Sequence, residues 1–318
     1  MKLRCAVLDD YQNVALSFAD WSRIEERVEV VVFREHIDNE RELAERLQDF
    51  PIVVIMRERT PFPASLFARL PKLKLLVTTG MRNASVDLAA AAEHGVVVSG
   101  TGGAGAGTAE LTWALILGLA RSVVAENQSL RLGGKWQSTI GVDLFGKRLG
   151  LVGLGRIGSQ VAKVGQAFGM QVSAWSQNLT AEKARQIGVE YASKEELLSG
   201  SDYVSIHLVL SDRTRGLIGP GELSFLKPTA YLINTSRAPI VDQEALIDAL
   251  QQGRIAGAGL DVYDIEPLPS RHPYRYLPNV LATPHIGYVT EDAYRVFFEH
   301  TVENIKSFLE GAPLRTLY

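Results

Sequence analysis

Short apolar segments alternate with longer amphipathic segments along most of the chain. The short segments are rich in Val, Ile and Leu, whereas apolar residues in the longer ones recur at helical spacing, as at Leu111, Leu115 and Leu119. Strands and helices that alternate in this way form parallel sheets with helical crossovers, so the sequence predicts an α/β fold. The predicted strands cover residues 5–8, 28–33, 52–56, 75–78, 96–99, 148–152, 171–175, 203–206, 230–234, 256–260 and 280–282.

A stretch dominated by glycine, residues 100–107, separates the first five predicted strands from the other six. It precedes a predicted helix over residues 108–121 and is interpreted as a hinge. The 318 residues also exceed the length at which one hydrophobic core usually stops growing. We therefore predict two domains, and we expect the amphipathic helix predicted over residues 291–309 to return to the first of them.

Composition and charge exclude several classes of partner. The net charge of −3 and the isoelectric point near 6.1 leave no basic excess for binding nucleic acid. The single cysteine, Cys5, excludes internal disulfides and cysteine-based zinc sites, which fits a reducing compartment. No apolar run reaches membrane-spanning length, and the run near the N-terminus is too short for a signal peptide. We expect a soluble cytoplasmic protein with no nucleic-acid or membrane partner and no bound metal.

A glycine motif, G-x-G-x-x-G, directly follows one of the predicted strands and opens a predicted helix. Its glycines are Gly153, Gly155 and Gly158, and Arg156 and Ile157 lie between the last two. In dinucleotide-binding proteins the first glycine permits a tight turn, the second lets the pyrophosphate approach the backbone, and the third lets the helix pack on the strand. The N-terminus of the helix offers unpaired N–H groups to the phosphates. This context predicts a site for NAD or NADP rather than an ordinary turn.

The choice between NAD and NADP depends on the end of the next predicted strand. An NAD site normally has an acidic residue about 20 positions after the glycines, where it accepts the ribose hydroxyls. Here Ser176 and Gln177 take that place, and no Asp or Glu occurs between Gly153 and Glu182. Neutral polar side chains can bind either a hydroxyl or a phosphate, and Arg156 is a nearby cation that could meet a 2′-phosphate. The sequence leaves both cofactors open and favours NADP.

Three chemically suited residues follow three different predicted strands, at the edge where parallel sheets bind ligands. The reduction of a 2-keto acid needs a cation for the carboxylate, a proton donor for the carbonyl oxygen, and a group that keeps the donor protonated. The guanidinium of Arg237 suits the first role. The imidazole of His285 suits the second, and the carboxylate of Glu266 suits the third because it favours and orients the imidazolium. We predict that the three side chains form one catalytic group.

The other histidines carry weaker signals. His207 ends a predicted strand and is interpreted either as a cofactor contact or as a structural residue. His94 closes a predicted helix, where a cation complements the helix dipole. His36, His272 and His300 belong to no motif and are interpreted as surface residues.

Taken together, these motifs resemble the D-isomer-specific 2-hydroxyacid dehydrogenase family along nearly the whole chain. The matching stretches are residues 153–158, 202–208, 232–242, 259–267 and 283–287. The resemblance implies two doubly wound parallel-sheet domains: a Rossmann dinucleotide-binding domain, residues 101–287, inserted in a discontinuous flavodoxin-like substrate domain, residues 1–100 and 288–318. It also implies an active site in the cleft between the domains, a small 2-keto or D-2-hydroxy acid as substrate, and a homodimer.

The resemblance also implies roles for individual residues, with Arg237, Glu266 and His285 as the catalytic residues. The candidate cofactor-binding residues are Gly153, Gly155, Arg156, Ile157, Gly158, Ser176, Gln177, Thr108, His207, Thr214, Thr235 and Asp261. The candidate substrate-binding residues are Arg57, Gly80, Met81, Arg82, Arg237 and His285. Arg57 has an alternative interpretation as a surface residue beside Glu58.

Departures from the family pattern concern the cofactor and the substrate rather than the reaction. Ser176 stands where many members have the ribose-binding acid, and Tyr288 stands where a small residue is usual, so its bulk is expected to narrow the substrate pocket. Some members act instead as NAD(H)-responsive transcriptional partners, so a binding or corepressor-like module is the alternative function. Formate oxidation on the same fold would require Gln in place of Glu266, which argues against it.

Overall fold

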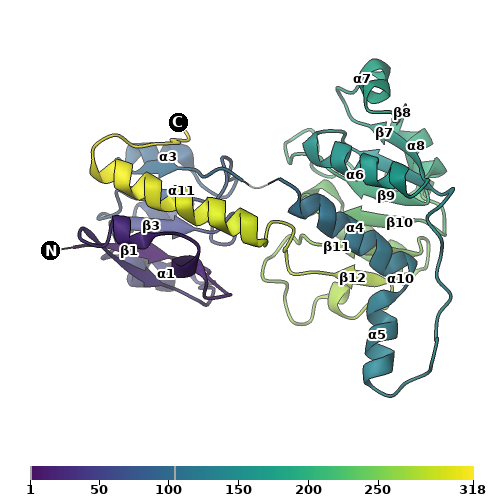
Figure 1. The fold of residues 1–318 in the computed structure, drawn as a ribbon, viewed down its shortest axis with the longest axis horizontal. Helices are drawn as coiled ribbons and strands as arrows, with labels where there is room; N and C mark the ends of the chain where they lie inside the picture. Colours follow the sequence, from purple (N-terminus) through teal and green to yellow (C-terminus); the bar gives the residue numbers. More distant parts are fainter. Residues whose placement is uncertain (1, 104) are drawn as a thin grey trace. The chain divides into compact units, whose positions relative to one another are not determined.

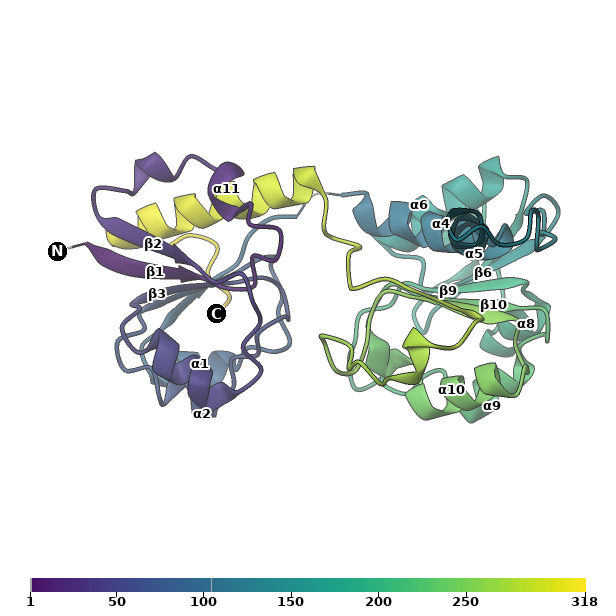
Figure 2. The same cartoon turned by 90° about the horizontal axis from the view of Figure 1, so that it is seen from below.

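The computed structural model describes residues 2–103 and 105–318, which form two compact units (Figure 1). Unit 1 comprises Met1–Gly105 and Thr290–Tyr318, and unit 2 comprises Ala106–Val289. Each unit contains one sheet of parallel strands with helices on both faces (Figure 2). The predicted α/β fold with two parallel-sheet domains is therefore confirmed.

The sheet of unit 1 has the strand order β2-β1-β3-β4-β5, which is the flavodoxin-like order. Its strands are β1 (Leu3–Val7), β2 (Val28–Val32), β3 (Ile52–Ile55), β4 (Leu75–Thr78) and β5 (Val97–Ser99). All residues of β3 and β4 are buried, as expected for strands that are covered on both faces. The C-terminal segment adds an antiparallel bridge from Thr316 to Ser99 at the β5 edge.

Helices cover both faces of this sheet. One face packs against α1 (Glu40–Leu47), α2 (Ala64–Phe67) and α3 (Leu88–Glu93), and the other packs against α11 (Glu291–Leu309) (Figure 2). Two short 3-10 helices, η1 (Ala15–Ser17) and η2 (Trp21–Arg23), follow β1. Side chains of Asn39, Asp87 and Thr290 cap α1, α3 and α11, so each helix begins at a residue that satisfies its free N–H groups.

The sheet of unit 2 has the strand order β12-β11-β10-β9-β6-β7-β8. Its strands are β6 (Arg148–Val152), β7 (Gln171–Trp175), β8 (Glu190–Tyr191), β9 (Tyr203–Ile206), β10 (Tyr231–Asn234), β11 (Gly257–Leu260) and β12 (Val280–Ala282). This is the Rossmann order, in which the chain reverses direction across the sheet between β6 and β9. Ligands of such sheets bind beyond the carboxyl ends of the strands near this reversal.

Two helical layers enclose the sheet of unit 2 (Figure 2). The first layer contains α4 (Gly107–Ala120) and α6 (Arg156–Ala167), and the second contains α8 (Lys194–Gly200), α9 (Pro220–Phe225) and α10 (Gln243–Gln251). The remaining helices of unit 2 are α5 (Val123–Arg131), α7 (Ala181–Gln186), η3 (Ala238–Ile240) and η4 (Pro273–Arg275).

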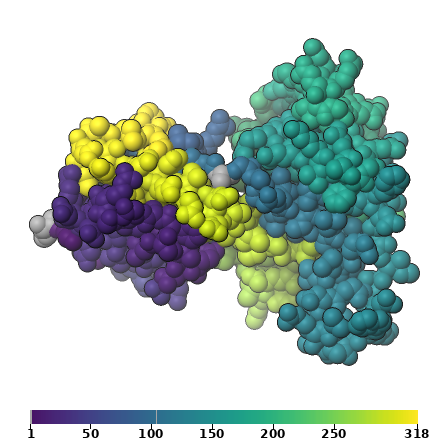
Figure 3. Space-filling model, in the orientation of Figure 1, coloured from purple at the N-terminus to yellow at the C-terminus, as the bar shows by residue number. Residues whose placement is uncertain are grey.

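Helix α5 and the loop that follows it project from unit 2, and we call residues 123–145 the α5 arm (Figures 1 and 3). No residue of α5 is buried. The loop is held to the helix by Glu126, whose carboxylate accepts hydrogen bonds from Ser138 and Thr139. Among the described residues no single helix is long and apolar enough to cross a membrane; α4 and α5, which meet at a 65° bend, reach the required length and composition only as a pair.

Candidate active site

The ends of three neighbouring strands in unit 2 carry the three residues that the sequence predicts to be catalytic. In the register of β10, β11 and β12, Asn234 pairs with Leu260 and Leu260 pairs with Ala282. Arg237 comes three residues after Asn234, and His285 comes three residues after Ala282. The chain therefore leaves β10 and β12 at the same level of the sheet. Glu266 lies in the loop after β11, the strand between them. The fold therefore brings all three segments to one edge of the sheet.

The side chains of His285 and Glu266 form a direct pair. Nδ1 of His285 lies 2.6 Å from Oε2 of Glu266, and both side chains are mostly buried. The other carboxylate oxygen, Oε1, accepts the N–H of Tyr263 at 2.9 Å. Among the described residues Nε2 of His285 has no hydrogen-bond partner, so this nitrogen is available to a ligand. The ring of Tyr288 packs edge-on against the imidazole, with ring centres 5.3 Å apart.

The backbone of His285 has a φ of 52°, a conformation that side-chain-bearing residues rarely adopt. Buried Asp261 helps to hold it there, because Oδ1 accepts the Thr283 hydroxyl and the N–H of Ile286, and Oδ2 accepts the N–H of Gly287. Burial raises the pKa of Asp261, while these hydrogen bonds and the nearby His285 act in the opposite direction. Asp261 is thus bonded to the chain segments on both sides of His285.

Arg237 is the residue before η3, and its backbone is extended. Buried Asn234 forms the turn that leads to it: its side-chain amide donates to the Arg237 carbonyl at 3.0 Å and accepts the N–H of Ser236 at 3.0 Å. The guanidinium donates to the Ser236 carbonyl at 2.7 Å. The turn therefore holds both the backbone of Arg237 and one nitrogen of its half-buried guanidinium, Nη1.

The glycine turn between β6 and α6 has the geometry of a pyrophosphate site. Gly153 has a φ of +107°, and a Cβ atom there would lie 2.5 Å from the His207 carbonyl oxygen. A Cβ atom on Gly158 would overlap the Gly153 carbonyl, whereas one on Gly155 would meet nothing within 4 Å. Gly155 is the N-cap of α6 and has no side chain to cap the helix, and the N-terminus of a helix attracts phosphates. These observations fit a dinucleotide.

The remaining candidate cofactor residues differ in what their side chains already contact. His207 is hydrogen-bonded to Ser205 at 2.9 Å, and burial lowers its pKa to about 4, so the ring is neutral near pH 7. The hydroxyl of Thr108 donates to the Gly287 carbonyl, that of Thr235 pairs with Thr112, and that of Thr214 donates to the Val209 carbonyl.

The residues expected to contact the ribose and the phosphates lie at the end of β7 and the start of α6. Ser176 is half-buried and directly follows β7, and Gln177 after it is exposed. Arg156 is the first residue of α6 and is also exposed, while Ile157 packs against the core beneath that helix. Ser176 and Gln177 thus lie just beyond the carboxyl end of β7, the neighbour of the strand β6 that leads into the glycine turn.

The candidate substrate residues of unit 1 lie after β3 and β4, which are neighbours in the sheet. Arg57 has a φ of 53°, and its guanidinium covers Gly80 so closely that a Cβ atom there would overlap it. Arg57 also lies 3.7 Å from the Glu58 carboxylate. The N–H of Gly80 donates to Thr101, whereas the N–H groups of Met81 and Arg82 have no hydrogen-bond partner among the described residues. Two free donors beside a guanidinium suit a carboxylate.

Sequence reasoning missed several polar contacts. His36, interpreted as a surface residue, has a mostly buried side chain that bonds to buried Asp9 at 2.9 Å, and this bond raises its pKa. His300 accepts the N–H of Gly102, and His272 lies 3.2 Å from the Gln243 amide oxygen, so neither is a free surface side chain. Asp9 follows β1, so the expectation that polar residues after strand ends are functional could have identified it. The partners of the histidines lie in segments distant in sequence, which no local pattern indicates. Within the described residues no cluster of His, Cys, Asp and Glu could hold a metal ion.

Comparisons with known proteins agree with this arrangement. The family model described as D-isomer specific 2-hydroxyacid dehydrogenase, NAD binding domain, matches residues 113–287. Glyoxylate reductase of Aeropyrum pernix is 41% identical over 255 residues, which cover 77% of this chain and 76% of the relative. D-3-phosphoglycerate dehydrogenase of Bacillus subtilis is 36% identical over 264 residues, 82% of this chain and 50% of the relative. The crystal structure of phosphoglycerate oxidoreductase from Vibrio cholerae o395 superposes with a TM-score of 0.93 at 37% identity, covering 98% of this chain and 100% of that one.

Proposed function

Since the chain belongs to the D-isomer specific 2-hydroxyacid dehydrogenase family, we propose that it is a reductase of small 2-keto acids that uses NADPH or NADH. Family membership makes it an oxidoreductase of 2-hydroxy acids that depends on a nicotinamide cofactor. The 2.6 Å pair of His285 and Glu266, at the sheet edge that also carries Arg237, is the observation on which the residue roles rest. The substrate classes named for its relatives, glyoxylate and phosphoglycerate, are the first to test.

The proposed roles follow from the chemistry of the three side chains. When bound, the reduced dinucleotide supplies a hydride to the carbonyl carbon. Arg237 binds the substrate carboxylate with its guanidinium, and Nε2 of His285 donates a proton to the carbonyl oxygen as that oxygen becomes a hydroxyl. Glu266 holds Nδ1, which fixes the ring orientation and leaves Nε2 as the proton-carrying atom. Oxidation of the hydroxy acid uses the same groups in reverse, with His285 as the base.

We assign the dinucleotide to unit 2 and the organic acid in part to unit 1. The cofactor residues proposed are the glycine turn with Arg156 and Ile157, the β7 end with Ser176 and Gln177, and Thr108, His207, Thr214, Thr235 and Asp261. In unit 1 the proposed substrate contacts are Arg57, Gly80, Met81 and Arg82. The free N–H groups of Met81 and Arg82 support this assignment.

The experiment that tests the proposed function is a panel of 2-keto acids assayed with NADH and with NADPH, followed by the absorbance of the reduced nicotinamide. We expect turnover of at least one small 2-keto acid, and, for any keto acid whose hydroxy product is chiral, a D-configured product by chiral chromatography. Tight dinucleotide binding in calorimetry without turnover of any acid would contradict the reductase and favour an NAD(H)-responsive binding module.

We propose that NADP is preferred over NAD because no carboxylate ends β7. Replacing Ser176 by Asp should shift the ratio of kcat/KM for NADPH over NADH by about 10- to 100-fold toward NADH, since a carboxylate accepts ribose hydroxyls and repels a 2′-phosphate. The ratio is measured at a saturating concentration of the best keto acid.

Thr180→Asp is the matched control for this prediction. It adds the same charge four positions along the chain, at the N-cap of α7, where Asp caps as well as Thr. An unchanged ratio in Ser176→Asp, or an equal shift in Thr180→Asp, would contradict the role of Ser176.

We also propose a homodimer in which a second copy covers the α5 arm. Ile140 is 97% exposed and Trp136 is 79% exposed, and Leu130, Leu132 and Phe145 are exposed in the same arm. Soluble monomers rarely expose so many large apolar side chains within one short segment. Ile140→Glu should therefore shift the sedimentation coefficient from a dimer toward a monomer. Tyr191→Glu, which changes an exposed aromatic residue of β8, should leave the dimer intact; a monomeric wild type would contradict the proposal.

A further inference from the structure

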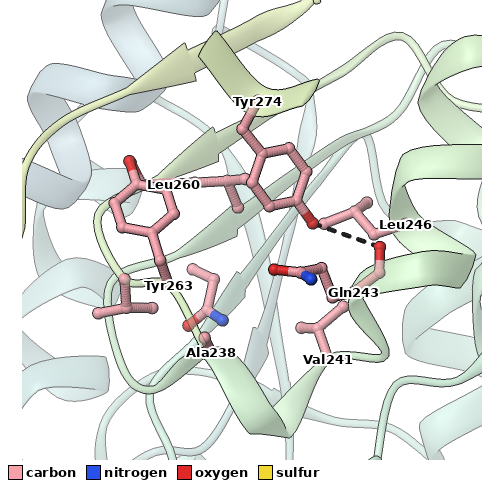
Figure 4. A pocket seen from close by; sticks show the side chains of 9 residues that line it. Ala238, Val241, Gln243, Leu246, Leu260, Tyr263 and Tyr274 are labelled. Atoms are coloured by element: carbon pink, nitrogen blue, oxygen red, sulfur yellow. Dashed lines mark hydrogen bonds between the residues drawn. The ribbon is translucent and has the colours of Figure 1, made fainter. Parts of the chain in front are cut away.

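Tyr263 contacts or borders the segments that carry all three proposed catalytic residues. Its backbone N–H donates to Oε1 of Glu266 at 2.9 Å. Its hydroxyl donates to the carbonyl of Thr283 at 2.8 Å, with the Leu260 carbonyl 3.1 Å away. Its ring lines a small cavity of about 10 Å³ together with Ala238, the residue after Arg237 (Figure 4). One buried side chain thus lies between the three strand ends.

The carbonyl of Thr283 is the point at which this side chain acts on His285. It accepts the Tyr263 hydroxyl and also the N–H of His285 at 2.9 Å. His285 is held at a φ of 52°, and such a backbone persists only when its surroundings fix it. Asp261 binds the Thr283 hydroxyl and the N–H groups beyond His285, but it makes no bond to the Thr283 carbonyl. The Tyr263 hydroxyl is the side-chain group that fixes this carbonyl.

We propose that Tyr263 is a positioning residue, whose hydroxyl holds the Thr283 carbonyl so that the His285 ring remains aligned with Glu266. The inference rests on the proposed function and adds a residue that acts through His285 without touching the substrate. Burial raises the pKa of Tyr263, so the hydroxyl stays a protonated donor across the working pH range. Removal of this donor should leave the imidazole in place but allow it more than one orientation.

Tyr274 supplies a matched control within the same cavity. Its ring centre lies 6.4 Å from that of Tyr263, and both side chains are buried. The two hydroxyls point away from each other in Figure 4, and that of Tyr274 is directed at the Gln243 carbonyl of α10, at 3.5 Å. Loss of either hydroxyl removes one buried polar group next to the same cavity. Only Tyr263 is bonded to the segment that carries His285.

The test compares Tyr263→Phe with Tyr274→Phe in the 318-residue chain. Phe has the shape of the ring it replaces, so both variants should fold, which a urea unfolding curve checks. We expect Tyr263→Phe to lower kcat about 3- to 10-fold, the loss associated with one net hydrogen bond. We also expect it to displace the pH–rate profile while KM for the dinucleotide is unchanged. Tyr274→Phe should keep the wild-type kcat and pH–rate profile.

Two outcomes would overturn the inference: a wild-type kcat and pH–rate profile in Tyr263→Phe, or equal changes in both variants, which would indicate a general effect on the cavity. The wild type and His285→Ala separate this failure from failure of the proposed function. A wild type that turns over no keto acid would refute the proposed function itself, and a fully active His285→Ala variant would refute the role of His285 through which Tyr263 is proposed to act. An inactive His285→Ala variant beside an unaltered Tyr263→Phe variant would refute only the role of Tyr263.

Discussion

Replacement of His285 by alanine is expected to lower kcat for keto-acid reduction by about 10²- to 10⁴-fold, because the proton donor acts in the transition state. Dinucleotide affinity should remain near the wild-type value, since the glycine turn proposed to bind the dinucleotide follows β6 whereas His285 follows β12. Single-turnover kinetics with the reduced cofactor measure the first effect, and calorimetric titration measures the second.

His94→Ala is the control for this variant. It also removes an imidazole, but His94 lies at the end of α3 in unit 1, where its ring bonds to the carbonyl of Ala90 in its own helix and stacks against Phe67. Its kcat should equal that of the wild type. If His285→Ala lost cofactor affinity in parallel with turnover, His285 would be a binding or folding residue rather than the proton donor.

Arg237→Ala is expected to lower kcat/KM for the keto acid by about 10²- to 10³-fold, because the substrate carboxylate would lose a charged, bidentate partner. Arg237→Lys should recover only part of this loss, since a lysine ammonium keeps the charge but lacks the planar fork. Initial rates over a range of keto-acid concentrations give both values.

The control for Arg237 is Arg254→Ala, which removes an exposed guanidinium that pairs with Asp248 elsewhere in unit 2. This change should leave kcat/KM unaltered, because Arg254 is not a proposed substrate contact. Loss of an exposed ion pair should also cost little stability, so the variant should remain folded. Full activity in Arg237→Lys would contradict bidentate binding, and full activity in Arg237→Ala would remove Arg237 from the site.

The strands were predictable because most of them are buried on both faces, which makes each one a continuous apolar run. The strands Leu75–Thr78, Arg148–Val152 and Tyr203–Ile206 have the same bounds in the sequence prediction and in the structure, and nearly all of their residues are buried. The short strand Glu190–Tyr191 was missed because both of its residues are exposed. It is a strand because it pairs with Ser173 and Ala174 of β7, and the local sequence pattern does not indicate this pairing.

The grouping of Arg237, Glu266 and His285 at one sheet edge was predictable for a related reason. Neighbouring parallel strands place their carboxyl ends together, so polar residues that follow them are brought to one edge. Tyr263 was missed because a buried aromatic residue looks like any other core residue until its hydroxyl partner is known. That partner, the Thr283 carbonyl, is a backbone atom 20 positions away, and a sequence carries no signal for it.

The return of the chain to unit 1 sets an order in which the two units can be completed during synthesis. The face of the first sheet that packs against α11, and the β5 edge that pairs with Thr316, are both covered by residues that follow unit 2 in the chain. Domains generally fold as units while they emerge from the ribosome. All five strands of unit 1 are therefore synthesised before those of unit 2, yet unit 1 is completed after unit 2. The N-terminal sheet keeps one apolar face uncovered until α11 has been synthesised.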